Sequence, residues 1–277
     1  EKKKIGWSPL RGLLKSADHF ASAFAEKTSN KLQFLFEPPD LSFYRGQERK
    51  NSLYPLSVID TNDSRPHTLV VAPTGAGKTD FLLKRCQGRI FYTLPFQASI
   101  NSMYQRFKEK IPTPHIRLLH ATSKIIERSR RDEQVLQPLG GSSVKVMTPH
   151  QLAAIIFGTS GFESMMLDVQ GTDVILDEIH TYSEYSQAMV IEVVKALLRL
   201  NCSLHIGTAT MPSVLYDNLL DILGGREQVY EVSLNENTLE TFNRHQIYKL
   251  KDENGLNELL KQAFKRKEKV LLIYNTV

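Results

Sequence analysis

From residue 66 onward, short continuous apolar runs alternate with longer segments in which apolar residues recur at helical spacing. Short apolar runs are typical of strands buried on both faces, and the periodic segments are typical of amphipathic helices. This alternation predicts an α/β fold with a mostly parallel sheet and helices on both faces. The expected strands lie at 68–73, 89–95, 116–120, 144–148, 173–178 and 203–209, and the expected helices at 77–86, 96–109, 149–157, 185–200 and 212–222.

The segments on either side of this alternation have a different pattern. An amphipathic helix is expected over 12–23, followed by a connector with few apolar runs. Beyond a polar gap near residue 235, a helix over 255–267 and a strand over 269–275 indicate another unit. Since no helix follows that last apolar strand, we expect the chain to be a fragment of a longer protein. The predicted parts are 1–30, 31–65, 66–245 and 246–277.

Between the first expected strand and helix lies Ala72-Pro-Thr-Gly-Ala-Gly-Lys-Thr79, which departs from the pattern G-x-x-x-x-G-K-[ST] only at its first position. Backbone N–H groups of such a loop can wrap phosphate oxygens at the positive end of the helix. Lys78 would bridge the terminal phosphates of ATP, and the Thr79 hydroxyl would bind Mg²⁺. The alternative is a glycine-rich turn that merely reverses the chain. The sequence Gly-Lys-Thr at the start of a helix disfavours this alternative. The predicted nucleotide-binding residues are Thr74, Gly75, Ala76, Gly77, Lys78 and Thr79.

A second chemical signal is Asp173-Val-Ile-Leu-Asp-Glu178, an apolar run that ends in two carboxylates. A parallel strand delivers its last residues to the same sheet edge as the phosphate loop. Asp177 would hold Mg²⁺, and Glu178 would polarise the attacking water, so these two residues and Lys78 are the predicted catalytic set. His180 would transmit the nucleotide state. An acidic pair can also simply begin a helix, but the upstream loop favours the catalytic interpretation.

Composition adds few constraints. The chain has 277 residues, of which 41% are hydrophobic, and a formal net charge of +5, compatible with a polyanionic partner without requiring one. Because no apolar run could span a bilayer and no signal peptide opens the sequence, we expect a cytoplasmic protein without a membrane partner. The only cysteines, Cys86 and Cys202, are expected to be buried thiols and not a disulfide or a metal site.

Three further segments indicate which class of NTP-hydrolysing motor the chain resembles. Thr208-Ala-Thr210 follows an expected strand and resembles the S/T-A-T motif of superfamily 2 helicases, whose hydroxyls couple hydrolysis to domain movement. Pro95 and Gln97 follow another strand, and Thr148 follows a third. Helix N-terminal amides and hydroxyls there could hold a phosphate backbone without reading bases. Each segment alone is ordinary capping chemistry, but their order around the two ATP motifs is that of a helicase.

Together these motifs resemble the DEAD/DEAH-like superfamily 2 helicases, and in detail the helicase-nuclease family of type I CRISPR interference. The segments that carry the closer resemblance are Leu94-Pro95 with Asn101–Tyr104, Asp177–His180 with Tyr182 and Tyr185, Ala209–Pro212 and Val270–Val277. The resemblance runs from about residue 12 to the end. It departs from the family at Ala72, where a glycine is usual, and at Thr208, where serine is commoner.

This resemblance implies a RecA-like P-loop NTPase core that acts as an ATP-dependent DNA helicase in a prokaryotic cytoplasm. The implied partners are single-stranded DNA, a multi-subunit CRISPR effector complex and, as a possibility for such a protein, an inhibitor protein. In the full protein, the helicase would feed DNA to an HD nuclease that holds a transition metal. The implied domains are the terminal helix of the HD nuclease (1–30), a connector (31–65), the first RecA-like domain (66–245) and the start of the second (246–277).

The resemblance also assigns roles to two residues before the phosphate loop. Asp18 would be a remnant ligand of the HD metal site, although one carboxylate cannot hold a transition metal alone and a solvated helix face is the alternative. No nuclease activity is therefore expected from these residues. Gln47, with Phe43 and Tyr44, would contact adenine, and the alternative for the aromatic pair is a packing anchor.

Two other interpretations of the chain stay open at this stage. A DEAH-type RNA helicase would share both ATP motifs, and a non-catalytic docking fragment would keep them without turnover. The basic residues Lys124, Arg128, Arg130 and Arg131 could line a DNA channel or form a solvated helix face.

Overall fold

The structure is a computed structural model that describes residues 8–32, 35–112, 116–119, 140–158, 162–179, 184–242, 249 and 253–271. The chain divides into two compact units, residues 1–238 and 239–277. This division falls a few residues before the expected boundary at 245, and each unit is described by itself.

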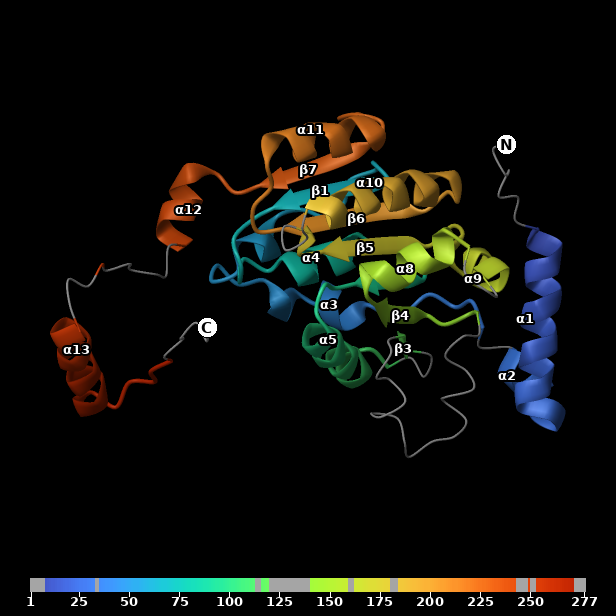
Figure 1. The fold of residues 1–277 in the computed structure, drawn as a ribbon, viewed down its shortest axis with the longest axis horizontal. Coiled ribbons are helices and arrows are strands. Elements are labelled where there is room, and N and C mark those ends of the chain that lie inside the picture. Colours follow the sequence, from blue (N-terminus) through green and yellow to red (C-terminus); the bar gives the residue numbers. More distant parts are fainter. Residues whose placement is uncertain are drawn as a thin grey trace. The chain divides into compact units, whose positions relative to one another are not determined.

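The first unit contains a seven-stranded sheet in which every paired neighbour is parallel (Figure 1). The strands are β1 (His67–Val71), β2 (Ile90–Thr93), β3 (Ile116–Leu119), β4 (Val144–Met147), β5 (Asp173–Asp177), β6 (Ser203–Thr208) and β7 (Val229–Ser233). Their order is β3-β4-β2-β5-β6-β1-β7. All six expected strands are present, which confirms the predicted parallel α/β fold, and β7 is an additional edge strand.

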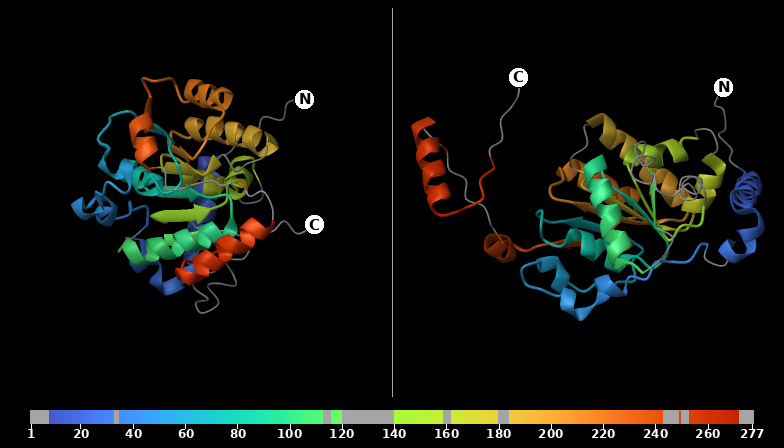
Figure 2. Two further views of the ribbon diagram at one scale, coloured as in Figure 1. Left: turned by 90° about the vertical axis from the view of Figure 1, so that its left-hand side faces the viewer. Right: turned by 90° about the horizontal axis from the view of Figure 1, so that it is seen from below.

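Helices cover both faces of the sheet (Figures 1 and 2). The successive residues Phe91 and Tyr92 of β2 belong to opposite faces, because side chains alternate along a strand. Phe91 joins a core cluster with residues of the helices on one face, whereas Tyr92 contacts Phe107 of the other layer with ring centroids 5.5 Å apart. The main helices are α4 (Lys78–Arg85), α5 (Gln97–Lys110), α8 (Pro149–Ile156), α9 (Phe162–Val169), α10 (Glu184–Arg199) and α11 (Ser213–Ile222).

The helix α9 was not expected from the sequence. It buries two acids, Glu163 and Asp168, which a sequence pattern would assign to a solvated face. Glu163 accepts a hydrogen bond from the Nε of Arg11 at 2.7 Å. The amino-terminal helix packs closely on α9, since a Cβ added at Gly12 would lie 2.6 Å from the carbonyl oxygen of Glu163.

That amino-terminal helix is α1 (Pro9–Phe24), which contains the expected segment 12–23. Short helical elements follow it through the connector: η1 (Ala25–Lys27), α2 (Thr28–Leu32), α3 (Ser42–Arg45), η2 (Gln47–Arg49) and η3 (Pro55–Val58). The connector is thus more structured than its composition indicated.

The second unit contains α13 (Glu253–Lys265), at the position of the helix expected over 255–267. A further helix, α12 (Glu236–Phe242), spans the division between the units. The strand expected over 269–275 is absent from 269–271, and its remaining residues lie outside the described ones. None of the helices in the described ranges is long and apolar enough to cross a membrane.

Candidate functional site

The phosphate loop connects the end of β1 to the start of α4. Gly75 and Gly77 have φ angles of 84° and 95°, a region that residues with a Cβ rarely adopt. The Ala76 N–H donates to the carbonyl of Pro73 at 3.1 Å and closes the turn. The sequence therefore folds into a tight loop directly before the positive end of α4, as an anion cradle requires.

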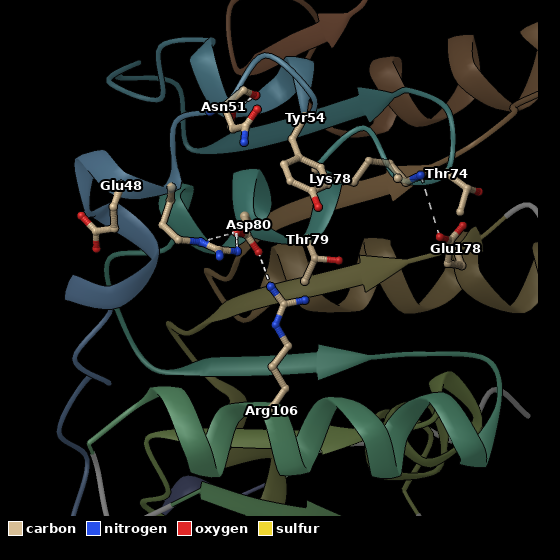
Figure 3. Close-up of a pocket in the computed structure, with 13 residues that line it drawn as sticks. Glu48, Asn51, Tyr54, Thr74, Lys78, Thr79, Asp80, Arg106 and Glu178 are labelled. Carbon is tan, nitrogen blue, oxygen red and sulfur yellow. Dashed lines mark hydrogen bonds and ion pairs between the residues drawn. The ribbon is translucent and has the colours of Figure 1, made fainter. Parts of the chain in front are cut away.

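Lys78, the first residue of α4, is almost entirely buried at the base of this loop. Its Nζ donates to the carbonyl oxygen of Ala72 at 2.9 Å and lies 3.8 Å from the Oε1 of Glu178, an ion pair drawn in Figure 3. Both partners are oxygens that phosphate oxygens could replace. The lysine Nζ therefore already lies where it could contact a bound anion.

The carboxylate pair lies at the same edge of the sheet, as expected. Asp177 ends β5 and pairs in register with Gly207 of β6, the strand between β5 and β1. A Cβ at Gly207 would lie 2.7 Å from Cδ1 of Leu82 in α4 and 3.1 Å from Oδ1 of Asp177. Glycine at this position therefore lets the Leu82 side chain and the Asp177 carboxylate pack closely over β6.

Glu178 has a φ of 58°, which is unusual for a residue with a side chain. Its N–H donates to the carbonyl of Gly207 at 2.9 Å, which fixes this left-handed backbone at the end of β5. Such a conformation persists only where its surroundings impose it, and it is common at functional sites. Here it turns the chain so that the Glu178 side chain borders the same cavity as the phosphate loop.

Burial raises the pKa of Asp177 to about 6. The Tyr92 hydroxyl donates to its Oδ2 at 2.5 Å and opposes this effect, whereas the neighbouring charge of Glu178 adds to it. A carboxylate that is costly to ionise when alone gains from a cation beside it, because the cation restores the lost solvation. The site's electrostatics therefore suit a metal-binding role.

The raised pKa of Asp177 predicts that nucleotide affinity depends on pH. Below pH about 6, Asp177 takes up a proton. If Asp177 is a ligand of Mg²⁺, the ion must displace this proton, so Mg²⁺-dependent nucleotide affinity should fall with acidification. The protonated form stabilises the fold below the ordinary pKa of 3.8, and this contribution is lost as the pH rises through about 6. Tyr92→Phe removes the opposing donor and should move the affinity midpoint to higher pH. Calorimetric titrations of both proteins at fixed Mg²⁺ would test this, and equal midpoints would contradict it.

The phosphate loop, the start of α4 and Glu178 border one cavity of about 420 Å³. Its walls combine phosphate-loop residues and Glu178 with residues that sequence reasoning did not include (Figure 3). The additional residues are Glu48, Arg49, Asn51, Tyr54, Ser57, Asp80 and Arg106. Most come from the connector, and no motif in the sequence identified them.

The connector reaches the cavity because it is attached to the phosphate loop. The N–H of Leu56 donates to the carbonyl of Ala76 at 3.0 Å, and Ser57 exchanges hydrogen bonds with the backbone of Asn51. Gln47 does not border this cavity but lines an adjacent one with Arg45. The adenine contact predicted for Gln47 thus stays a prediction.

The residues predicted to hold nucleic acid lie on neighbouring strand ends. The Leu94 N–H donates to the Met147 carbonyl at 3.1 Å, so the segments that lead to Pro95 and Thr148 run side by side. Gln97 begins α5. Thr148 forms a capping box with Gln151 of α8, which gives its hydroxyl a structural task as well.

The predicted coupling residues are only partly described. Thr208 is buried at the end of β6, and its hydroxyl donates to the carbonyl of Thr210 at 2.8 Å. His180 lies outside the described residues, as do Tyr182 and the basic residues of 124–131.

Asp18 is exposed on α1, and within the described ranges no set of three metal-ligating side chains includes it. Cys86 and Cys202 are both buried and free, as expected. Cys86 nevertheless clusters with Asp173 and His205, so the exclusion of a metal there stays a prediction. Asp173 already accepts from the N–H groups of Gln87 and Gly88, and its other oxygen lies 3.0 Å from the Nε2 of His205.

Comparisons with known proteins agree with this geometry. The chain is 30% identical over 159 residues to the CRISPR-associated nuclease/helicase Cas3 of Methanothermobacter thermautotrophicus, which covers 52% of this chain and 19% of that protein. It is 25% identical over 190 residues to the CRISPR-associated endonuclease/helicase Cas3 of Escherichia coli K12, covering 57% and 21%. The chain thus corresponds to about a fifth of each of these relatives.

Among solved structures, Cas3-ATP of T. fusca has a similar fold, with a TM-score of 0.54 and 17% identity over 76% of this chain and 28% of that one. Residues 56–218 match the DEAD/DEAH box helicase family, and this range includes the phosphate loop, Asp177, Glu178 and Thr208–Thr210. The match extends over more than half of the chain. With its parallel sheet and its Cas3-like helicase domain, the chain belongs to the DEAD/DEAH box helicase family.

Proposed function

We propose that the chain is the ATP-binding core of a DNA helicase that acts in CRISPR interference. The observation that carries this proposal is the meeting of Lys78, Thr79 and Glu178 around one cavity, with Asp177 at the adjoining strand end. The similarity to Cas3 proteins supports the CRISPR role. In the full protein, the core would pull single-stranded DNA toward an HD nuclease with its own transition metal, and it would work with a multi-subunit effector complex.

In this proposal the loop amides and Lys78 hold the terminal phosphates of ATP. The Thr79 hydroxyl and the Asp177 carboxylate are oxygen donors of the kind that Mg²⁺ prefers, and they would hold it. The ion would supply neutralisation of phosphate charge. Glu178 would orient the attacking water and accept its proton. Hydrolysis then needs further positive charge on the transferring phosphoryl group.

In the proposed full protein, arginines of a second RecA-like core would supply that further charge. We therefore expect the 277-residue chain to bind Mg-ATP, to hydrolyse it slowly and not to unwind DNA. Calorimetry, a phosphate-release assay and a strand-displacement assay would measure the three properties. Turnover equal to that of a protein with both cores would contradict this expectation.

Two alternatives make different predictions. A DEAH-type RNA helicase would prefer RNA to single-stranded DNA of matched sequence, so a binding comparison at one salt concentration separates the two. The segments proposed to hold phosphates, at Pro95 and Gln97 and at Thr148, follow adjacent strands. Such contacts would not read bases, so binding of both RNA and single-stranded DNA must be measured. A docking fragment, or the target of an inhibitor protein, would bind no nucleotide at all if its pocket were inert.

A further inference from the structure

A chain of ion pairs crosses the nucleotide cavity beside the phosphate loop. Asp80 follows Thr79 on α4, and each of its two carboxylate oxygens is bound by a different arginine. Arg49 of η2 donates from both Nε, at 3.1 Å, and Nη2 to one oxygen. Arg106 of α5 donates to the other at 2.5 Å. Figure 3 shows the Arg106 side chain extending from α5 to the Asp80 carboxylate.

All three residues border the cavity proposed for ATP. The Asp80 carboxylate is mostly buried, whereas about a third of each arginine side chain is exposed. A charged pair at a partly buried site interacts more strongly than one on the surface. A nucleoside triphosphate that enters the cavity would bring more negative charge than Asp80 carries. Because guanidinium groups pair well with phosphate oxygens, it would compete with Asp80 for the two arginines.

Arg106 and its neighbour Phe107 both connect α5 to the proposed site. The next residue, Phe107, is fully buried and packs against Tyr92, whose hydroxyl donates to Asp177. One turn of α5 therefore contacts the phosphate-loop helix through Asp80 and the proposed Mg²⁺ ligand through Tyr92. A displacement of Asp80 or of Asp177 on nucleotide binding would therefore be transmitted to α5 through these contacts.

The other end of α5 lies at the proposed nucleic-acid edge. The helix begins at Gln97, directly after Pro95 and Phe96, and its 14 residues span about 20 Å at the rise of an α-helix. A helix of this length moves as one body when its packed side is displaced. The nucleotide end and the nucleic-acid end are thus joined by one rigid element.

We infer that Arg106 is a positioning residue that reports nucleotide occupancy to α5. When the phosphates arrive, Arg106 exchanges part of its bond with Asp80 for the new anion, and α5 shifts with it. The inference rests on the proposed function, since it takes ATP as the occupant of the cavity. It assigns to this ion pair the link between nucleotide binding and the residues that would hold DNA.

Hydrogen–deuterium exchange of the full 277-residue chain, with and without Mg-ADP or a non-hydrolysable ATP analogue, tests this link. In the wild type, nucleotide should slow exchange in the phosphate loop and also change exchange in α5. At nucleotide concentrations that saturate each protein, Arg106→Gln should keep the loop response and lose at least half of the α5 response. Arg106→Lys retains a charge that can pair with Asp80 and should restore part of it.

The matched control is Lys108→Gln, which removes a positive charge from the same helix. Lys108 is exposed and lies over the ring of Tyr104, outside the cavity, so its loss should leave both responses unchanged. Thermal melting of each variant reports whether it is folded. If Arg106→Gln does not fold, Arg106→Lys and the wild type still decide the question.

The possible failures are distinguishable. If the wild-type loop shows no response to nucleotide, the proposed ATP binding is wrong. If the loop responds but α5 does not, or if α5 responds equally in the wild type and in Arg106→Gln, the inferred role of Arg106 is wrong while ATP binding stands.

Discussion

Replacement of Lys78 with alanine should nearly abolish nucleotide binding. The ammonium group is buried at the base of the phosphate loop, where it already faces the Ala72 carbonyl and Glu178. Loss of one partner from a buried, hydrogen-bonded charge pair costs about 2–5 kcal/mol, which corresponds to a decrease in Mg-ATP affinity of roughly 30- to 5000-fold. Isothermal titration calorimetry with the wild-type and variant chains measures it.

A control for this change is available on the same helix. Lys84→Ala also removes a positive charge from α4, but Lys84 borders the adjacent cavity and not the one beside the phosphate loop. Its affinity should stay near that of the wild type. If Lys78→Ala bound Mg-ATP as well as Lys84→Ala does, the cavity would not be the ATP site, and a docking role would become the better interpretation.

A second large effect is expected far from the nucleotide, where Asp168→Ala should destabilise the fold by about 3–5 kcal/mol. The buried Asp168 carboxylate pairs with Lys145 and Arg89, each at 2.6 Å, and accepts the Gly141 N–H. Burial opposes its charge, but the two cations hold its pKa below the ordinary value. Without Asp168, Lys145 and Arg89 would both lose the buried carboxylate that they share.

Urea denaturation measures this effect, and in a thermal melt the melting temperature should fall by roughly 6–20 °C for a domain of this size. Asp221→Ala is the matched control, because it removes an exposed acid from α11 and should change stability by less than about 0.5 kcal/mol. Equal stabilities for the two variants would show that the Asp168 cluster does not hold the fold together.

The sheet and the phosphate loop could be predicted because their signals are local. Continuous apolar runs such as 174–176 identify buried strands, and the glycines of the loop identify a backbone conformation. The strand β7 was missed because it is an edge strand with a partly exposed pattern, and edge strands do not require continuous apolar runs. The helix α9 was missed because its acids, Glu163 and Asp168, are buried by ion pairs with distant residues.

The cavity walls could not be predicted for a related reason. Asp80 and Arg106 are 26 positions apart, and their ion pair exists only because α4 and α5 pack on the same face of the sheet. Tyr54 and Asn51 reach the site because the connector folds back on the phosphate loop. Motifs identify residues that perform chemistry through fixed local geometry, whereas residues positioned by tertiary contacts leave no such signal in one sequence.

The missing side chain at Gly207 has a consequence for redesign of this core. Because a Cβ there would lie 2.7 Å from Cδ1 of Leu82 in α4 and 3.1 Å from Oδ1 of Asp177, a larger residue at 207 requires the Leu82 side chain to move. The packing behind the phosphate-loop helix is therefore set by positions 82 and 207 together, although neither belongs to a nucleotide-binding motif.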